Sequence, residues 1–376
     1  MSTEKKEAQE NLEAVMPENK MKEKARIKKA ATISIIAAII AEIIIIAVMT
    51  FINSDGYKYI TSEVEGGLSI TGFRNKDYQG ELTIPDEING KPVIMIGESA
   101  FYRCKKLTDV IIPDSVKRIG EGAFSSCNAL VSVTIPGSVT TIAEKAFFDC
   151  TALKSVVLPD SVTNMENSAF EGCRKLSAIT LSNSLGVINE SVFNGCVELK
   201  DIVIPSSVTS IEDLAFYGCI SLTNVSIFEG VLNIGNNAFE NCRALTSVKI
   251  PDSVINMGSS VFSCCESLES LTIGKGIDKI LEKTFSGCTL LESVCIPEGV
   301  ESIGWRAFAD CAKLKTLTIS ATLENLGEES FAGCESLYAI DYDGTMLQWE
   351  LIDKMENWDS GVNICTINCS DKNINP

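Results

Sequence analysis

The feature that most constrains the fold is a Phe-x-x-Cys motif that recurs every 23 residues, from Phe101/Cys104 to Phe331/Cys334. Its eleven copies follow one another without an insertion or deletion. The surrounding residues repeat as well, in the pattern L-x-x-V-x-I-P-x-x-V-x-x-I-x-x-x-A-F-x-x-C that begins at Leu107. Self-similarity at a fixed period of this length is the signature of stacked repeats. We therefore expect a solenoid in which each 23-residue unit forms one coil.

Each unit predicts a short strand, a second extended piece and a helical turn. Residues 109–112 alternate in the period of two that places one set of side chains in a core. Pro113 lacks the amide hydrogen that would extend the strand. A second extended piece is expected around Val116 to Ile119, and a tight helical turn at Ala123-Phe124. A single coil cannot bury enough apolar surface to offset the entropy of ordering it, so the coils must stack.

The N-terminal region predicts a membrane anchor. Residues 30–52 are almost wholly Ile, Ala, Val, Met and Phe, and a helix of that length spans a bilayer core. Six basic residues lie between Lys20 and Lys29, so the positive-inside rule places the N-terminus in the cytoplasm and the repeats outside. No small-x-small cleavage site follows the span, which favours an uncleaved signal anchor over a signal peptide. Glu42 lies near its middle, either as a contact with a partner helix or without a role.

The repeat units resemble leucine-rich repeats of the BspA-like class, also called the Treponema-type repeat, over about Leu82 to Cys334. The flanks resemble the caps of that class: Gly67 to Ile96 with its Asn89-Gly90 turn, and residues 343–369 with Trp349 and Trp358. Asn368 stands where relatives carry His. The resemblance implies a leucine-rich-repeat solenoid on a cell surface and a binding role in adhesion. Four coils depart from the pattern in the Pro position, which should loosen their turns: Ser182, Phe228, Gly274 and Ser320.

The whole sequence therefore predicts a leucine-rich-repeat solenoid, with short strands plus helical turns, behind a single N-terminal transmembrane helix. The expected parts are a cytoplasmic basic tail at 1–29, the anchor at 30–52, an N-terminal cap at 53–100, the repeats at 101–334 and a C-terminal cap at 335–376.

The cysteines are expected to be buried fillers and not disulfides. Of the 15 cysteines, eleven occupy the same position in successive coils, so their Cα–Cβ vectors run parallel instead of pointing at each other. Cys264 and Cys295 should point outward, and Cys365 could pair with Cys369. Without a CxxC pair or any His, no metal site or cofactor is expected. The predicted structural columns are Phe124, Phe147, Phe170, Phe193, Phe216, Phe239, Cys127, Cys150, Cys173, Cys196, Cys219 and Cys242.

Composition narrows the function to binding. The absence of His removes the commonest general base, and a net charge of −18 argues against a nucleic-acid partner. No catalytic residue is singled out, and no enzyme activity is expected. The outward residues of the first strand of each coil form the predicted ligand-binding face for an extracellular protein or glycan. They are Ser132, Thr134, Ser155, Thr180, Asp201, Asn224, Ser226, Ser247, Lys249, Ser270, Thr272, Ser293, Thr316 and Thr318. The alternatives are that these are merely soluble strand residues on a passive stalk, or that the chain is a signalling or assembly subunit that acts through Glu42 and the tail.

Overall fold

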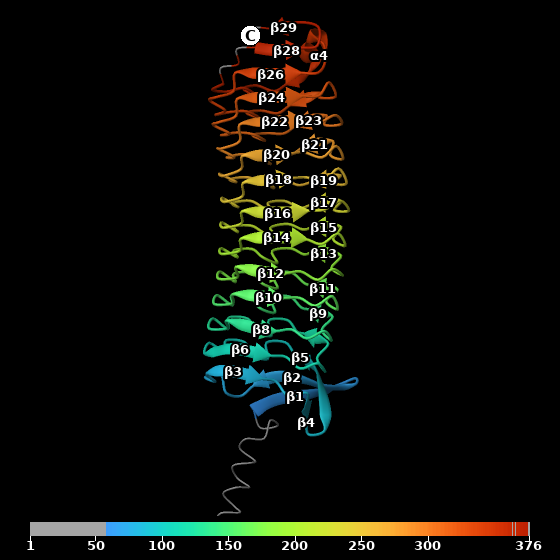
Figure 1. Cartoon of the computed structure of the whole chain (residues 1–376), viewed down its shortest axis with the longest axis vertical. Helices are drawn as coiled ribbons and strands as arrows, with labels where there is room; N and C mark the ends of the chain where they lie inside the picture. The colour runs from blue at the N-terminus through green and yellow to red at the C-terminus, as the bar shows by residue number, and fades with distance from the viewer. Residues whose placement is uncertain (1–57, 363, 365, 375–376) are drawn as a thin grey trace, which may run out of the picture. The chain divides into compact units, whose positions relative to one another are not determined.

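Each 23-residue unit forms one coil of a solenoid and contributes one strand to each of two strand columns (Figure 1). The computed structural model describes residues 58–362, 364 and 366–374. The first-strand column consists of β3 (Gly80–Thr83), β6 (Leu107–Ile111), β8 (Ser132–Thr134), β10 (Ser155–Val157), β12 (Ala178–Thr180), β14 (Asp201–Ile204), β16 (Asn224–Ile227), β18 (Ser247–Lys249), β20 (Ser270–Thr272), β22 (Ser293–Ile296), β24 (Thr316–Ile319), β26 (Ala339–Tyr342) and β28 (Thr366–Cys369). The second-strand column consists of β7 (Arg118–Ile119), β9 (Thr141–Ile142), β11 (Asn164–Met165), β13 (Val187–Ile188), β15 (Ser210–Ile211), β17 (Asn233–Ile234), β19 (Asn256–Met257), β21 (Lys279–Ile280), β23 (Ser302–Ile303), β25 (Asn325–Leu326) and β27 (Asp353–Lys354). Equivalent residues of neighbouring coils pair in parallel, as Asp201 does with Asn224.

The strand prediction is confirmed. In β6 and just after it, Val110 and Ile112 are buried, whereas Ile111 is exposed. The strand ends before Pro113, which cannot donate to the ladder. The second extended piece is shorter than expected, because only Arg118 and Ile119 pair with neighbouring coils.

The predicted helical turn is wrong. The chain around Ala123-Phe124 forms consecutive turns, with bonds such as Ser125 N to Gly122 O and Cys127 N to Phe124 O. Gly122 and Ser126 have φ values of 55° and 58°, which a right-handed helix cannot include. Within the described residues the coils contain no helix, and the one helix with defined bounds is α4 (Met346–Leu351) in the C-terminal cap.

A continuous corner of Phe and Cys residues runs along the stack, and we call it the Phe/Cys corner. The Phe side chains from Phe101 to Phe331 are fully buried, and successive rings stack with centroids 4.9–6.0 Å apart and planes within 20° of parallel. The Phe amides also join the coils, as Phe124 N donates to Ala146 O at 2.8 Å. The Phe column predicted from the repeat is confirmed.

The cysteines of the corner are buried and free, as expected, but they are more than fillers. From Cys127 to Cys334 each thiol donates a hydrogen bond to the Phe carbonyl of the preceding coil, over 3.1–3.4 Å. The first of these bonds joins Cys127 Sγ to Phe101 O. Each of these Phe carbonyls also accepts from the backbone N–H of the Cys in its own coil, as Phe124 O does from Cys127 N at 3.1 Å. The thiol therefore adds a second bond to the carbonyl, and this bond joins two coils.

Both strand columns are interrupted at the same two coils. β12 does not pair with β14, nor β11 with β13, and the same gaps recur between β20 and β22 and between β19 and β21. The coil of β12 therefore keeps ladder bonds to the preceding coil through its first strand and to the following coil through its second. The Phe/Cys corner is continuous at both interruptions. Phe170 N donates to Val192 O at the first, and Phe262 N donates to Thr284 O at the second.

The interrupted coils are two of the four that lack the repeat Pro. Ser182 follows β12 and Gly274 follows β20, whereas the ladders continue past Phe228 and Ser320. The prediction of a loosened turn is wrong for Ser182 and Ser320, because Leu185 N still donates to Ser182 O and Leu323 N to Ser320 O, both at 3.3 Å. The inward strand residues Ile179 and Leu271 are only partly buried in these coils. Gly274 is required by close packing, because a Cβ on it would lie 2.2 Å from the Pro251 carbonyl oxygen.

Caps close the two ends of the described repeats. β1 (Tyr59–Val64) pairs antiparallel with β2 (Gly67–Phe73), and β4 (Glu87–Ile88) with β5 (Lys91–Ile96). The β4–β5 hairpin turns at Asn89-Gly90, both with positive φ as a type I′ turn requires, so the hairpin predicted within residues 67–96 is confirmed.

The C-terminal cap covers the last coil. A capping box between Thr345 and Gln348 begins α4, which buries Trp349. The Trp358 ring meets the last Phe of the column, Phe331, edge-on with centroids 6.3 Å apart. β28 is followed by the antiparallel β29 (Asn373–Ile374), and Asn368 Nδ2 donates to Asp341 Oδ1 at 2.7 Å. These contacts seal the apolar end of the stack.

The predicted anchor at 30–52 and Glu42 lie outside the described residues. Among the residues that are described, no helix has the length and apolar character needed to cross a bilayer. Cys369 is free, and Cys365 lies outside the described residues.

Candidate ligand-binding surface

The first-strand column presents its outward side chains as one surface, the first-strand face. Twelve of the fourteen predicted face residues are exposed, and Thr316 and Thr318 are half-buried. The intervening strand residues point into the core, as Val133 and Ile202 do. Cys295 is exposed on this face and Cys264 is partly exposed elsewhere, both as expected.

Polar contacts between coils fix parts of this face. Ser132 Oγ donates to Asp109 Oδ1 at 2.5 Å, and this bond lowers the pKa of the Asp109 carboxyl. An equivalent bond joins two later coils: Asn224 Nδ2 donates to Asp201 Oδ1 at 2.7 Å. In both bonds the two residues occupy the same strand position in successive coils. Each carboxylate is held in place by its neighbour, so the face is ordered before any ligand arrives.

A hollow lies on the first-strand face at one of the two ladder interruptions. Between β12 and β14 lies a hollow of about 450 Å³, the β12–β14 pocket, whose lining includes Thr180, Leu181, Asn183, Asp201, Val203 and Phe228. Val203 is 58% exposed and Phe228 49% exposed, so an apolar wall stands open to solvent beside the Asp201 carboxylate. Two predicted face residues, Thr180 and Asp201, are brought together here.

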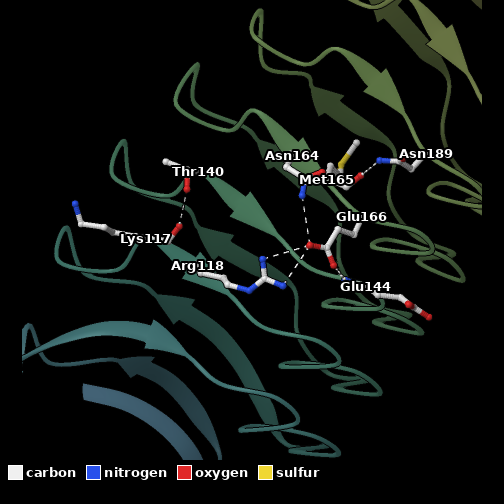
Figure 2. Close-up of polar contacts among 8 residues, drawn as sticks. All are labelled: Lys117, Arg118, Thr140, Glu144, Asn164, Met165, Glu166 and Asn189. Carbon is white, nitrogen blue, oxygen red and sulfur yellow. Dashed lines mark hydrogen bonds and ion pairs between the residues drawn. The ribbon is translucent and has the colours of Figure 1, made fainter. Parts of the chain in front are cut away.

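The second-strand column carries a polar cluster that spans three coils (Figure 2). The Glu166 carboxylate accepts from the Arg118 guanidinium at 3.2 and 3.3 Å, from the Asn164 amide and from the backbone N–H of Glu144. Next to it, the side-chain amide of Asn189 donates to Met165 O at 2.7 Å (Figure 2). This bond joins β11 to the coil of β13, where the ladder is missing.

A second hollow, of about 460 Å³, lies on the second-strand face near the other interruption. Its lining includes Glu212, Asn256, Asp278 and Lys279. Each interrupted coil is thus accompanied by a hollow, one on each strand face. The second hollow contains charges of both signs, whereas the β12–β14 pocket has one carboxylate against an apolar wall.

Burial keeps thiols of the Phe/Cys corner in the protonated form. Burial raises the pKa of Cys150 and of Cys219 to about 12, so these thiols stay protonated at neutral pH. Among the described residues, no group of three His, Cys, Asp or Glu side chains could hold a metal ion.

Sequence reasoning missed the β12–β14 pocket and the Arg118–Glu166 pair. Phe228 was singled out only as a departure from Pro, and its position two strands away from β12 gives no sign that it lines a hollow with Asp201. Arg118 and Glu166 lie 48 residues apart in the chain. The sequence contained one signal that these coils are unusual: the coils without Pro recur in every second unit.

The chain is similar to known repeat proteins. The family described as "BspA type Leucine rich repeat region (6 copies)" matches residues 94–223 and 209–338. A leucine rich cell surface protein from Faecalibacterium prausnitzii is 28% identical, over 79% of this chain and 96% of that one, with a TM-score of 0.45. A leucine-rich repeat protein from Bacteroides ovatus is 24% identical, over 83% and 97%, with a TM-score of 0.51. The pneumococcal vaccine antigen PcpA is 18% identical, over 81% and 96%, with a TM-score of 0.51. No curated relative matches the chain.

Proposed function

The chain belongs to the BspA-type leucine-rich repeat family, and from this premise we propose that it is a non-enzymatic binding scaffold displayed at a cell surface. The first-strand face is its contact surface for an extended extracellular protein or glycan. The observation that carries this proposal is the row of small, exposed polar side chains in register along the column, with Asp201 and Asp109 held in place by neighbouring coils. Such a row offers hydrogen bonds over many coils, as an extended partner requires.

The membrane anchor at 30–52 and the outward orientation of the repeats are part of the same proposal. They are supported by the apolar run and the six preceding basic residues. Protease added to intact cells should digest the repeats and leave residues 1–52 protected. Protection of the repeats until the cells are lysed would contradict the orientation.

The binding role is tested by capture. The region 53–376 is immobilised and exposed to host matrix, mucin and neighbouring-cell extracts. A variant with Ser132, Ser155 and Ser247 replaced together by Lys changes the face. A control with Lys at three exposed neutral positions that precede second strands, Thr140, Thr163 and Thr209, adds the same charge elsewhere. We expect the face variant to lose a captured partner that the control retains. Equal capture by both would place the contact elsewhere.

The competing role as a signalling or assembly subunit predicts a different result. Removing residues 1–29 should leave binding to cells unchanged if the chain is a tethered scaffold. Loss of a cellular response with binding intact would instead favour the signalling role. A passive stalk would capture no partner with either the native or the altered face.

A further inference from the structure

The β12–β14 pocket combines one fixed carboxylate with an apolar wall. Asp201 Oδ1 accepts from Asn224 Nδ2 at 2.7 Å, which fixes the carboxylate at the edge of β14. Val203 and Phe228 line the same hollow and are about half exposed or more. The volume of about 450 Å³ falls in the range of pockets that enclose small groups, about 300–1,000 Å³.

The pocket offers more hydrogen-bond acceptors than donors. The side-chain amide of Asn183 uses one of its two N–H groups on Asp160 Oδ1, which leaves one donor and one acceptor on that side chain. The Asp201 carboxylate contributes two oxygens that only accept, and the hydroxyls of Thr180 and Ser206 can each donate or accept. No Lys or Arg lines the pocket. A group that fits this set is rich in donors and carries a positive charge.

The apolar wall fits the remainder of such a group. Lys and Arg bury their methylene stems along apolar surface and keep the charged end at a polar site. The exposed ring of Phe228 can also attract a cation over its face. The net charge of −18 draws basic partners toward the molecule and repels acidic ones.

We propose that the β12–β14 pocket receives a lysine or arginine side chain from a basic segment of a partner protein. The charged end pairs with Asp201, and the stem packs on Val203 and Phe228. This inference rests on the binding role proposed above and narrows the partner to a basic polypeptide. A neutral sugar would leave the Asp201 carboxylate without a counter-charge, so it fits the pocket less well.

The chain provides a matched control for the carboxylate. Asp109 occupies the equivalent strand position, accepts a hydrogen bond from Ser132 as Asp201 does from Asn224, and lies on the uninterrupted β6–β8 ladder. Asp109→Asn and Asp201→Asn therefore remove the same charge from the same face. Only Asp201 lines the β12–β14 pocket.

The experiment measures binding of a fluorescein-labelled peptide with four lysines spaced by Gly-Ser to the full chain, by fluorescence anisotropy at low ionic strength. Acetylating the lysines should abolish binding. Asp201→Asn should weaken it about tenfold, which corresponds to about 1.4 kcal/mol, and Phe228→Ala several-fold, whereas Asp109→Asn should change it less than twofold. Melting temperatures confirm that the variants are folded.

Equal losses in Asp109→Asn and Asp201→Asn would overturn the proposal in favour of diffuse attraction to the acidic surface. Displacement of the peptide by N-acetyllactosamine from the native chain would overturn it in favour of a sugar site. A partner captured through the first-strand face that is indifferent to Asp201→Asn would leave the binding role standing and refute the pocket proposal alone.

Discussion

The Phe/Cys corner and the two strand columns are built from the same 23-residue unit, yet only the corner is continuous. Ring stacking, amide bonds and thiol bonds pass through every described coil of the corner, including those that follow β12 and β20. The strand columns lose their ladders at those two coils. The corner therefore holds the coils in register, and the strand columns are free to vary where they face solvent.

The difference also separates the chemistry of the two regions. The corner places neutral thiols in a fully buried environment, whereas the first-strand face exposes hydroxyls, amides and carboxylates. Changes in the corner should act on stability, and changes on the face should act on binding. Three measurements test this division.

Alkaline pH should produce the largest effect, and it should act through the corner. The pKa of Cys219 is raised by burial from 9.0 to about 12, so between these values the unfolded chain has lost the proton that the folded chain keeps. The stability present below pH 9 should then fall, as the pH rises above 9, by about 1.4 kcal/mol per pH unit for each such thiol. The pKa values of the nine corner thiols from Cys127 to Cys311 are raised, so together they should lower the free energy of unfolding by an amount of the order of 10 kcal/mol per pH unit. Urea unfolding between pH 8 and 10 measures the slope.

A matched pair of variants tests whether the corner thiols cause this dependence of the free energy of unfolding on pH. Cys219→Ala should reduce it by about 1.4 kcal/mol per pH unit, whereas replacing the exposed Cys295 with Ala should leave it unchanged. Identical slopes in the two would show that the corner thiols do not govern the alkaline transition.

Removing one ring from the corner should have the next largest effect. Phe193 is fully buried between Phe170 and Phe216, so Phe193→Ala should lower the free energy of unfolding by about 3–5 kcal/mol. Phe228→Ala, on the exposed wall of the pocket, should change it by less than about 0.5 kcal/mol. Urea unfolding compares them, and similar losses in both would erase the distinction between corner and face.

Charging the first-strand face should have the smallest effect on stability. Replacing Ser132, Ser155 and Ser247 together by Lys should change the free energy of unfolding by no more than about 0.5 kcal/mol, because all three side chains point to solvent. Val133→Lys, one position along β8, buries a charge and should unfold its coil. A large loss from the triple variant, measured by thermal melting, would mean that this face is packed against other residues.

The repeat period predicted much of this structure because it acts locally. Alternation along residues 109–112 decides which side chains are buried, and Pro113 decides where the strand ends; both operate within one coil. The predicted helical turn was wrong because regular spacing does not distinguish a helix from consecutive turns. Ser126, which has a positive φ, donates its backbone N–H to Phe148 O of the next coil, a bond that the sequence of one coil does not reveal. The thiol bonds were missed for the same reason, since each joins a Cys to a Phe 26 residues earlier.

The candidate site was predicted as a face but not as a pocket. The period places Thr180 and Asp201 on the same side of the stack, and the structure agrees. Whether β12 and β14 form a ladder depends on how two complete coils fit together, which a single-sequence pattern does not encode. The absence of Pro at Ser182 indicated the coil concerned without indicating that a hollow opens beside it.

The staggered interruptions also govern how the stack responds to mechanical load. The coil of β12 is tied to its predecessor through the first strand and to its successor through the second. Tension can therefore separate this coil from the preceding coil along the second-strand column and from the following coil along the first-strand column. The Phe/Cys corner would continue to join all three coils. A pulled molecule should therefore begin to separate at these coils, where strand ladders are missing and only the corner still joins both neighbours through every kind of contact.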